Sequence, residues 1–164
     1  MKIKIINKLA LDTNILGQLL NPDSTKFTEL KAWFRTILIS DTEVFLPGIV
    51  DYEMRRSLEL QRLKDSSYKE VERLNRFLQS VRYLPITMTD LNLAATLWAD
   101  ARRRGQKTED DRDLGGDPIL AAQVRSLFSP WVNVVLVTEN RKHLTRYGID
   151  ARSFQEILFP GMES

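Results

Sequence analysis

The chain has 164 residues and carries 24 Lys and Arg against 22 Asp and Glu, a formal net charge of +2. Hydrophobic residues make up 43% and charged residues 28%, and a globular chain of this length buries a core without disulfides or a structural metal. It contains no Cys and only one His, which excludes Cys-ligated zinc, iron–sulfur clusters, thiol nucleophiles and His-rich metal sites. Any chemistry must therefore use carboxylates, hydroxyls, amides and cations.

The sequence also bears on location and organisation. The N-terminal MKIKIINK has no apolar signal segment, and nothing approaches the roughly 18 consecutive apolar residues of a membrane span. There is no repeat and no Ser/Gly linker. We therefore expect one domain over residues 1–164, cytoplasmic and without a membrane partner. The mild positive charge permits a polyanionic partner but does not require one.

Short β-rich runs are spread along the chain. The run 134–137 is wholly apolar, and three of its four residues are the β-branched Val, which is typical of a strand buried on both faces of a parallel sheet. The predicted strands are 9–11 with its flanks, 44–46 and 134–137, with weaker candidates at 83–86 and 149–152.

Helical spacing of apolar residues appears between these runs. It predicts helices over 27–38 with Ser24 as N-cap, over 71–81, and over 91–101 after Thr89 or Asp90 as cap. Asp117 as N-cap and Pro118 in the first turn predict one further helix. Strands that alternate with helices indicate a three-layer α/β/α fold around a mainly parallel sheet, whose ligands bind at the carboxyl ends of the strands.

Polar residues gather at those expected strand ends. Asp12 follows the first strand, Glu53 lies in the helix after the second, and Asp117 opens a helix after the Gly115–Gly116 turn. Asn140 closes the Thr-Glu-Asn that follows the buried run 134–137. We expect all four to converge on one edge of the sheet.

Each position also has a purely structural interpretation. Asp12 could satisfy a turn, Asp117 could serve only as an N-cap, and Asn140 could cap a helix. Glu53 could pair with Arg56 on the surface. These interpretations do not explain why every strand end offers an oxygen ligand.

Electrostatics favours a cation at such a cluster. Two carboxylates about 4 Å apart repel by roughly 4 kcal/mol at an effective dielectric constant near 20, and three together by on the order of 10 kcal/mol. A cation or a proton must relieve that repulsion. Oxygen ligands without His or Cys favour Mg²⁺ or Mn²⁺.

The ordered set of motifs resembles the PIN-domain nucleases, and among them the VapC-type toxin ribonucleases of toxin–antitoxin modules. The motifs are LALDTNIL, LPGIVDYEMRR, GGDPILAAQ and VVLVTENRKHL, and the match runs from about residue 8 to 158. The resemblance implies a Rossmann-like α/β/α sandwich, Mg²⁺- or Mn²⁺-dependent cleavage of phosphodiester bonds, usually in RNA, a homodimer, and inhibition by an antitoxin.

The resemblance also implies roles for single residues. Asp12, Glu53 and Asp117 match the three metal-holding acids. Asn140 stands where the family often has a fourth Asp, with Thr138 as the supporting hydroxyl. A neutral amide there weakens any second metal site, and Glu139 on a strand would point to the opposite face.

Charged segments flank these positions. Arg141 and Lys142 follow Asn140 and are expected to bind substrate phosphates around the acidic centre, and Thr138 is expected to contact the substrate beside them. The acidic stretch Glu109, Asp110, Asp111 and Asp113 is interpreted as a solvated loop rather than as extra ligands.

The sequence thus predicts a metal-dependent endoribonuclease, the toxin of a toxin–antitoxin module, with Asp12, Glu53, Asp117 and Asn140 as catalytic residues. The alternatives are a PIN-like module that binds nucleic acid or protein without cleavage, and a nuclease that acts on DNA. The neutral Asn140 keeps the non-cleaving alternative open, whereas the three acids argue against it.

Overall fold

The computed structural model describes residues 5–106 and 115–157. Its core element is one sheet in which every neighbouring pair of strands is parallel, in the order β3-β2-β1-β4-β5. The strands are β1 (Lys8–Leu11), β2 (Glu43–Pro47), β3 (Arg82–Leu84), β4 (Val134–Val137) and β5 (Ala151–Arg152).

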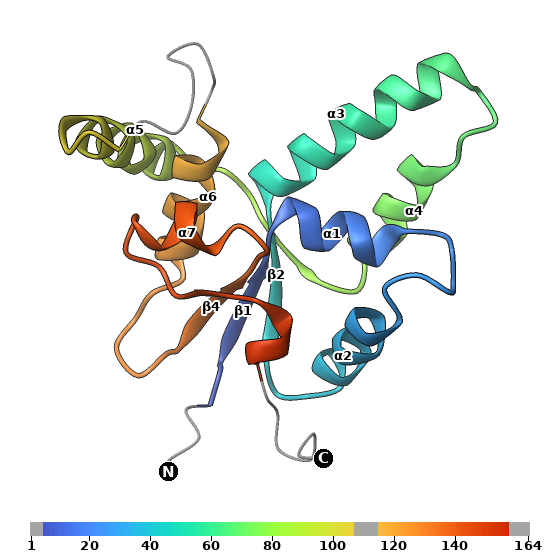
Figure 1. Cartoon of the computed structure of the whole chain (residues 1–164), viewed down its shortest axis with the longest axis horizontal. Helices are drawn as coiled ribbons and strands as arrows, with labels where there is room; N and C mark the ends of the chain where they lie inside the picture. The colour runs from blue at the N-terminus through green and yellow to red at the C-terminus, as the bar shows by residue number, and fades with distance from the viewer. Residues whose placement is uncertain (1–4, 107–114, 158–164) are drawn as a thin grey trace.

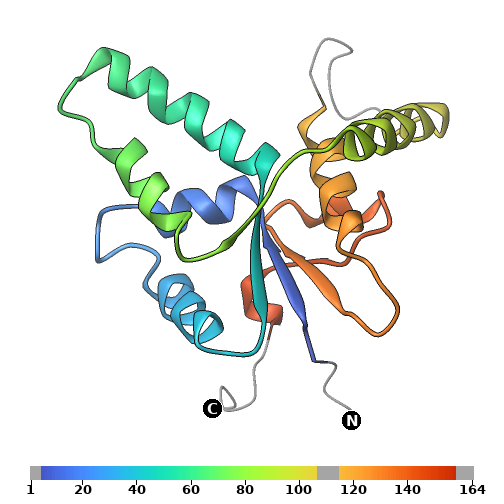
Figure 2. The same cartoon turned by 180° about the vertical axis from the view of Figure 1, so that it is seen from behind.

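Helices cover both faces of this sheet. Figures 1 and 2 show α1 to α4 on one side of the strands and α5 to α7 on the other, while α3 and α5 diverge beyond the carboxyl edge. The helices are α1 (Thr13–Leu20), α2 (Thr28–Leu38), α3 (Gly48–Lys64), α4 (Glu70–Phe77), α5 (Met88–Arg103), α6 (Gly116–Ser126) and α7 (Arg141–Thr145), followed by the 3₁₀ turn Phe154–Glu156. The three-layer α/β/α architecture with a parallel sheet is therefore confirmed.

The central strands are buried because their side chains are apolar on both faces. All four residues of β4 are buried, and so are the last three residues of β1. The stripe predicted over 71–81 belongs to the core: Leu74 is fully buried, and Leu78 and Val81 pack against the same cluster. Among the described residues, no helix is both long and apolar enough to cross a bilayer.

Three predicted N-caps are wrong. Ser24 is not a cap, because Asp23 accepts hydrogen bonds from Thr25 and closes a turn there, and α2 begins after Phe27. Helix α5 begins earlier than predicted, after Thr87. Helix α6 has Gly115 as its N-cap at φ 65°, a left-handed conformation that glycine adopts without a steric penalty.

The third correction moves Asp117 from the N-cap into the first turn of α6, where a carboxylate still faces the positive end of the helix dipole. Other bounds differ slightly from the predictions. Helix α4 ends at Phe77 rather than continuing to Val81, and β3 covers Arg82–Leu84 rather than 83–86.

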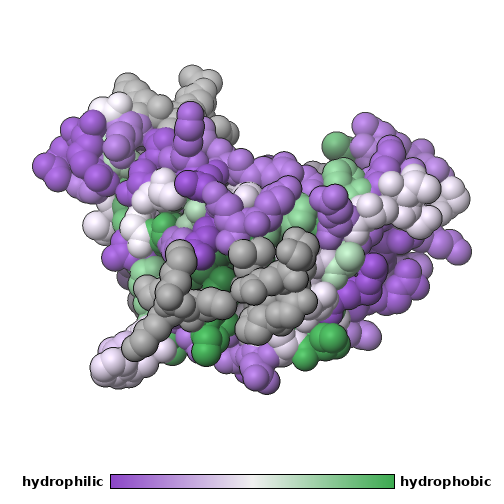
Figure 3. All heavy atoms as spheres, turned by 60° about the horizontal axis from the view of Figure 1, so that its bottom comes forward, coloured by the Kyte–Doolittle hydropathy of each residue, from purple (hydrophilic) through white to green (hydrophobic). Residues whose placement is uncertain are grey.

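The amino edge of the sheet exposes isolated apolar side chains. Ile5, Ile39 and Trp131, which lie near the starts of β1, β2 and β4, are 70%, 88% and 98% exposed. Figure 3 shows hydrophobic groups scattered among hydrophilic ones on this face. The polar residues of interest lie at the opposite edge.

Candidate active site

The candidate site is built around the carboxyl ends of the two adjacent strands β1 and β4. After β1 the chain enters α1 on one side of the sheet, and after β4 it enters α7 on the other side. Such a topological switch point is where parallel α/β sheets bind ligands, because the two connections diverge and leave the strand ends open. Asp12 follows β1 directly, and its backbone N–H donates to the Val137 carbonyl of β4.

Two neighbours fix the Asp12 carboxylate. Thr138 Oγ1 donates to Asp12 Oδ2 at 2.6 Å, and the Thr13 N–H donates to Asp12 Oδ1 at 2.7 Å. Thr138 is fully buried and Asp12 is 9% exposed. Burial raises the pKa of the Asp12 carboxyl above its ordinary value, and the hydrogen bonds from Thr138 and Thr13 oppose that rise. Desolvation therefore disfavours the ionised form of this group.

Glu53 reaches the same region from α3. Its Oε2 accepts a hydrogen bond from Thr13 Oγ1 at 2.7 Å, so Thr13 bridges the carboxylates of Asp12 and Glu53. The alternative that Glu53 pairs with Arg56 on the surface is wrong, because the Arg56 guanidinium lies over the Tyr52 ring, 5.7 Å from its centroid. Thr13 has a bridging role that the sequence prediction missed, although its hydroxyl lies inside the Asp-Thr-Asn motif.

The other oxygen of Glu53 lies against the start of α6. A Cβ atom on Gly116 would be 2.2 Å from Glu53 Oε1, so the carboxylate occupies the space that a side chain would fill. Asp117 is the next residue, in the first turn of the same helix. Glu53 is thus positioned between Thr13 of α1 and the helix that carries Asp117.

Asn140 is the N-cap residue of α7, without a capping hydrogen bond from its side chain. Its backbone N–H donates to Thr138 Oγ1 at 2.9 Å, which ties this corner to the Asp12–Thr138 pair. Glu139 is exposed and accepts a hydrogen bond from Gln18, away from Thr138. Glu139 lies in the bend after β4 and not on the strand, so the strand geometry expected for it does not apply, and its exclusion as a ligand stays a prediction.

Cations lie beside the site on α7. Arg141 and Lys142 are both exposed, and the Arg141 guanidinium forms an ion pair with Glu156. The acidic stretch at residues 109, 110, 111 and 113 lies outside the described residues.

The donor set fits a hard divalent cation in its chemistry. It consists of carboxylate, hydroxyl and amide oxygens, and Asn14 Oδ1, two residues after Asp12, is buried and lacks a hydrogen-bond partner. Across residues 5–106 and 115–157, no three acidic, His or Cys side chains are spaced to hold a metal ion. The assignment of Asp12, Glu53 and Asp117 as ligands therefore stays a prediction.

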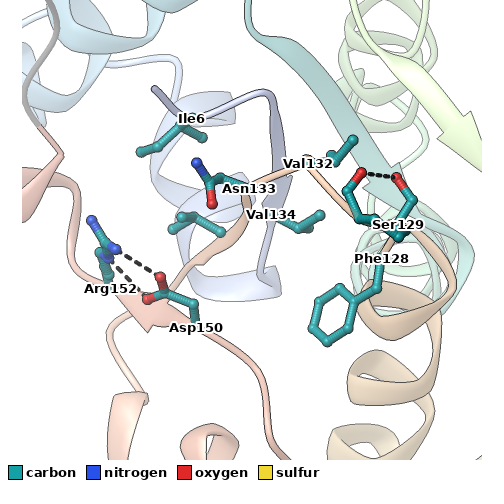
Figure 4. A pocket seen from close by; sticks show the side chains of 10 residues that line it. Ile6, Phe128, Ser129, Val132, Asn133, Val134, Asp150 and Arg152 are labelled. Carbon is teal, nitrogen blue, oxygen red and sulfur yellow. Dashed lines mark hydrogen bonds and ion pairs between the residues drawn. The ribbon is translucent and has the colours of Figure 1, made fainter. Parts of the chain in front are cut away.

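A separate hollow of about 520 Å³ is lined by the segment before β4, the first residues of β4 and residues at the start of β5 (Figure 4). Ile6, Val132 and Val134 contribute apolar side chains, and the Asp150–Arg152 ion pair closes one end. This hollow is at the opposite end of the sheet from the acids, so it is not a part of the candidate site.

Fold and site together define an α/β protein with an acid- and hydroxyl-lined edge at the switch point of a parallel sheet. The model of the PIN domain matches residues 9–127, which is most of the chain. The chain therefore belongs to the PIN-domain family, whose members are generally nucleases.

Solved structures share this fold. FitAcB from Neisseria gonorrhoeae has 19% identity and a TM-score of 0.66, over 91% of this chain and 99% of that chain. VapBC2 from Rickettsia felis, bound to a DNA fragment from its promoter, has 17% identity and a TM-score of 0.66, over 89% and 98%. DNA-bound VapBC from Salmonella typhimurium has 16% identity and a TM-score of 0.68, over 91% and 99%. No curated protein matches the chain by sequence.

Proposed function

We propose that this protein is a Mg²⁺- or Mn²⁺-dependent endoribonuclease, the toxin component of a toxin–antitoxin module, acting as one domain in the cytoplasm. The observation that carries the proposal is the bridge from Asp12 through Thr13 to Glu53, with Glu53 lying against Gly116 beside Asp117. Three separate motifs thus supply acids to one end of the sheet, and the PIN-domain match gives that end a nuclease context.

Asp12, Glu53 and Asp117 are the residues that would hold the metal ion. A divalent ion in such a site supplies Lewis-acid stabilisation of the phosphate and lowers the pKa of bound water. Thr138 holds the Asp12 carboxylate in one orientation from the buried side, and Thr13 does the same for Glu53. Asn140 would orient a water or complete the ligand shell.

Phosphate binding is assigned to cations beside the acids. Arg141 and Lys142 are exposed at the start of α7, directly after Asn140. Cations there would hold the RNA backbone without reading its sequence, since phosphate contacts position a nucleic acid and base contacts specify it.

The decisive experiment is cleavage of a structured RNA pool with Mn²⁺, Mg²⁺ or EDTA, compared with duplex and single-stranded DNA. We expect cleavage of RNA that requires the metal, and loss of at least about a hundredfold in rate for Asp12→Ala and Asp117→Asn. Unchanged cleavage in EDTA or in either variant contradicts the mechanism. Preferred cleavage of DNA establishes the DNA nuclease instead, and binding without cleavage establishes the non-cleaving module that the neutral Asn140 leaves open.

The partner proposed is a cognate antitoxin protein. The resemblance to VapC-type toxins and the structural likeness to VapBC and FitAcB support it. Co-expression with the product of a small neighbouring reading frame should give a stable complex and suppress RNA cleavage. A complex that leaves cleavage unchanged argues against an antitoxin.

We also propose a homodimer through the α5–α6 surface. A largely apolar hollow of about 510 Å³ lies there, lined by Leu91, Trp98 and Ile119 among others, and Leu91 is 43% exposed. Leu91→Asp should give a monomer in light scattering, whereas Leu63→Asp, at a 78% exposed position of α3, should remain dimeric. A dimeric Leu91→Asp protein contradicts this interface.

A further inference from the structure

A buried side chain joins the helices that carry two of the candidate ligands. Gln123 of α6 is fully buried, and both ends of its amide are used. Its Oε1 accepts from the Ile49 N–H at the start of α3 at 3.0 Å, and its Nε2 donates to the Leu84 carbonyl at the end of β3 at 2.8 Å. A single polar residue within the apolar run of α6 is the sequence signal for this contact.

Helix α3 depends on Gln123 for its start. The first N–H groups of a helix have no partner within the helix, and the N-cap Pro47 offers no side-chain acceptor. Gln123 satisfies one of them from another helix, at Ile49, four residues before Glu53. It therefore couples the position of the first turns of α3 to α6.

The second contact is at the N-terminal end of α6. A Cβ on Gly116 would come within 2.2 Å of Glu53 Oε1 and 3.4 Å of its Cδ, and Glu53 is the neighbour that this Cβ would meet among the described residues. The φ of Gly116 is not in the left-handed region, so its backbone would accept Ala. Glycine is needed at this position for the carboxylate, not for the turn.

We infer that Gly116 and Gln123 are positioning residues, which set where the Glu53 carboxylate lies relative to Asp117. The inference rests on the proposed function, in which these two acids hold one metal ion. Gln123 fixes helix α3 against α6, and the missing side chain at Gly116 lets the Glu53 carboxylate lie at the positive end of α6. A residue that holds a ligand in place typically affects metal affinity by about tenfold to a hundredfold when replaced.

Gly116→Ala should change the position of the Glu53 carboxylate without changing the stability of the fold. The displaced group is the far end of a flexible side chain, and Ala is favoured over Gly in a helix, so the melting temperature in EDTA should stay within about 3 °C of the parent. Mn²⁺ affinity, measured by calorimetry without RNA, should fall by at least about tenfold. The matched control is Gly17→Ala, whose Cβ would meet the Met54 methyl at 3.2 Å next to Glu53, and its Mn²⁺ affinity should not change.

Gln123→Met tests the other contact. It keeps the length of the side chain and removes both hydrogen bonds, so we expect a similar loss of Mn²⁺ affinity together with a lower melting temperature. Thr42→Val is the control for lost stability, because Thr42 Oγ1 donates to the Ile6 carbonyl at the amino edge, far from the acids. Thr42→Val should melt earlier and bind Mn²⁺ as the parent does.

A metal-free measurement distinguishes this inference from the proposed function. In EDTA, the change in melting temperature caused by Gly116→Ala should be more favourable in a Glu53→Ala background than in the parent. In the parent, the new methyl group must displace the Glu53 carboxylate, which then loses its hydrogen bond from Thr13. In the Glu53→Ala background there is no carboxylate to displace, so the two substitutions should not be additive. Additive effects, or parental Mn²⁺ affinity in both Gly116→Ala and Gln123→Met, overturn the inference. If the parent binds no Mn²⁺, the proposed function fails, and the coupling in EDTA alone decides whether Gly116 places Glu53.

Discussion

Asp12 differs from the other candidate ligands in its surroundings. It is buried, whereas Glu53, Asp117 and Asn140 are half-buried. Its two oxygens accept from Thr138 and Thr13, which partly offsets the cost of removing a carboxylate from water. A bound cation would further offset this desolvation cost. Among the candidate ligands, we therefore expect Asp12 to carry the largest electrostatic cost in the metal-free protein.

The pH dependence of stability follows from the raised pKa of Asp12. A carboxyl with a raised pKa binds its proton more tightly in the folded state, so its contribution to stability is present below the ordinary value of 3.8 and is lost as the pH rises through the folded-state pKa. In EDTA, Asp12→Asn should therefore gain stability relative to the parent as the pH rises from about 4 to 7. Urea unfolding of both proteins across that range measures the difference.

Asp23→Asn provides a control of opposite sign. Hydrogen bonds from the Thr25 side chain and backbone lower the pKa of Asp23, so its contribution is present above 3.8 and is lost as the pH falls. The parent should therefore gain stability relative to Asp23→Asn as the pH rises towards about 4, and the difference should change little between pH 4 and 7. A difference between the parent and Asp12→Asn that does not vary with pH would contradict the assigned environment of Asp12.

At the scale of elements, α5 is held at its start by a reciprocal cap. The Asp90 N–H donates to Thr87 Oγ1, and the Thr87 N–H donates to Asp90 Oδ2 at 2.8 Å. Thr89, one of the two predicted caps, is the second residue of α5, is exposed and takes no part in this cap.

Thr87→Ala should therefore lower the free energy of unfolding by about 1 kcal/mol. The Asp90 N–H loses its acceptor, the Thr87 hydroxyl, and the reciprocal bond to the Asp90 carboxylate is no longer held in place. Thr89→Ala should change it by less than about 0.5 kcal/mol, as for most exposed positions. Chemical denaturation of the two variants measures the contrast. Equal losses would show that the capping box does not stabilise α5.

Arg141, the first residue of α7, forms an ion pair at the surface. Arg141 is paired with Glu156, which competes with any phosphate for the guanidinium. Replacing both Arg141 and Lys142 by Ala should weaken RNA binding for every sequence and reduce the slope of log affinity against log salt by up to about two units.

Glu156→Gln gives the complementary change. It removes the competing charge and keeps an oxygen for the Ser153 N–H, so RNA affinity should rise. Arg82→Ala is the control, because Arg82 is an exposed arginine paired with Glu43 at the amino edge, and its salt slope should equal that of the parent. An unchanged slope in the double variant would remove Arg141 and Lys142 from the binding surface.

At the scale of the whole molecule, the site joins two layers of helices across the sheet. Asp12 and Glu53 come from the layer of α1 and α3, while Asp117 and Asn140 come from the layer of α6 and α7. A metal ion held between them would bind the folded state and not the unfolded chain, and would therefore stabilise the whole fold.

Mn²⁺ at about a hundred times its dissociation constant should stabilise the parent by roughly 2.7 kcal/mol, which raises the melting temperature by about 5–10 °C. Asp117→Asn should show a much smaller shift, because the neutral amide is a poorer ligand than the carboxylate. Thermal melts with EDTA and with Mn²⁺ test this in both proteins. Equal shifts would show that Asp117 does not bind the metal.

Elements with a local signal could be predicted from the amino-acid sequence. The apolar, Val-rich run 134–137 predicted a buried strand, and the alternation of strands and helices predicted a mainly parallel sheet between layers of helices. The acids could be placed at one edge because the carboxyl ends of parallel strands share that edge. Cap positions failed at Ser24, Thr89 and Asp117, because turns and hydrogen bonds a few residues away determine where each helix begins.

The atoms that meet in the site are brought together by the packing of the whole fold. The Thr138 hydroxyl reaches Asp12 across 126 residues, Thr13 reaches Glu53 across 40, and Gln123 reaches Ile49 across 74. Such contacts depend on strand register and on the packing of α3 against α6, and no local pattern encodes them. The role of Gly116 also depends on packing. In the sequence it is one of two adjacent glycines, and in the packed fold the Glu53 carboxylate occupies the space that a side chain at position 116 would fill.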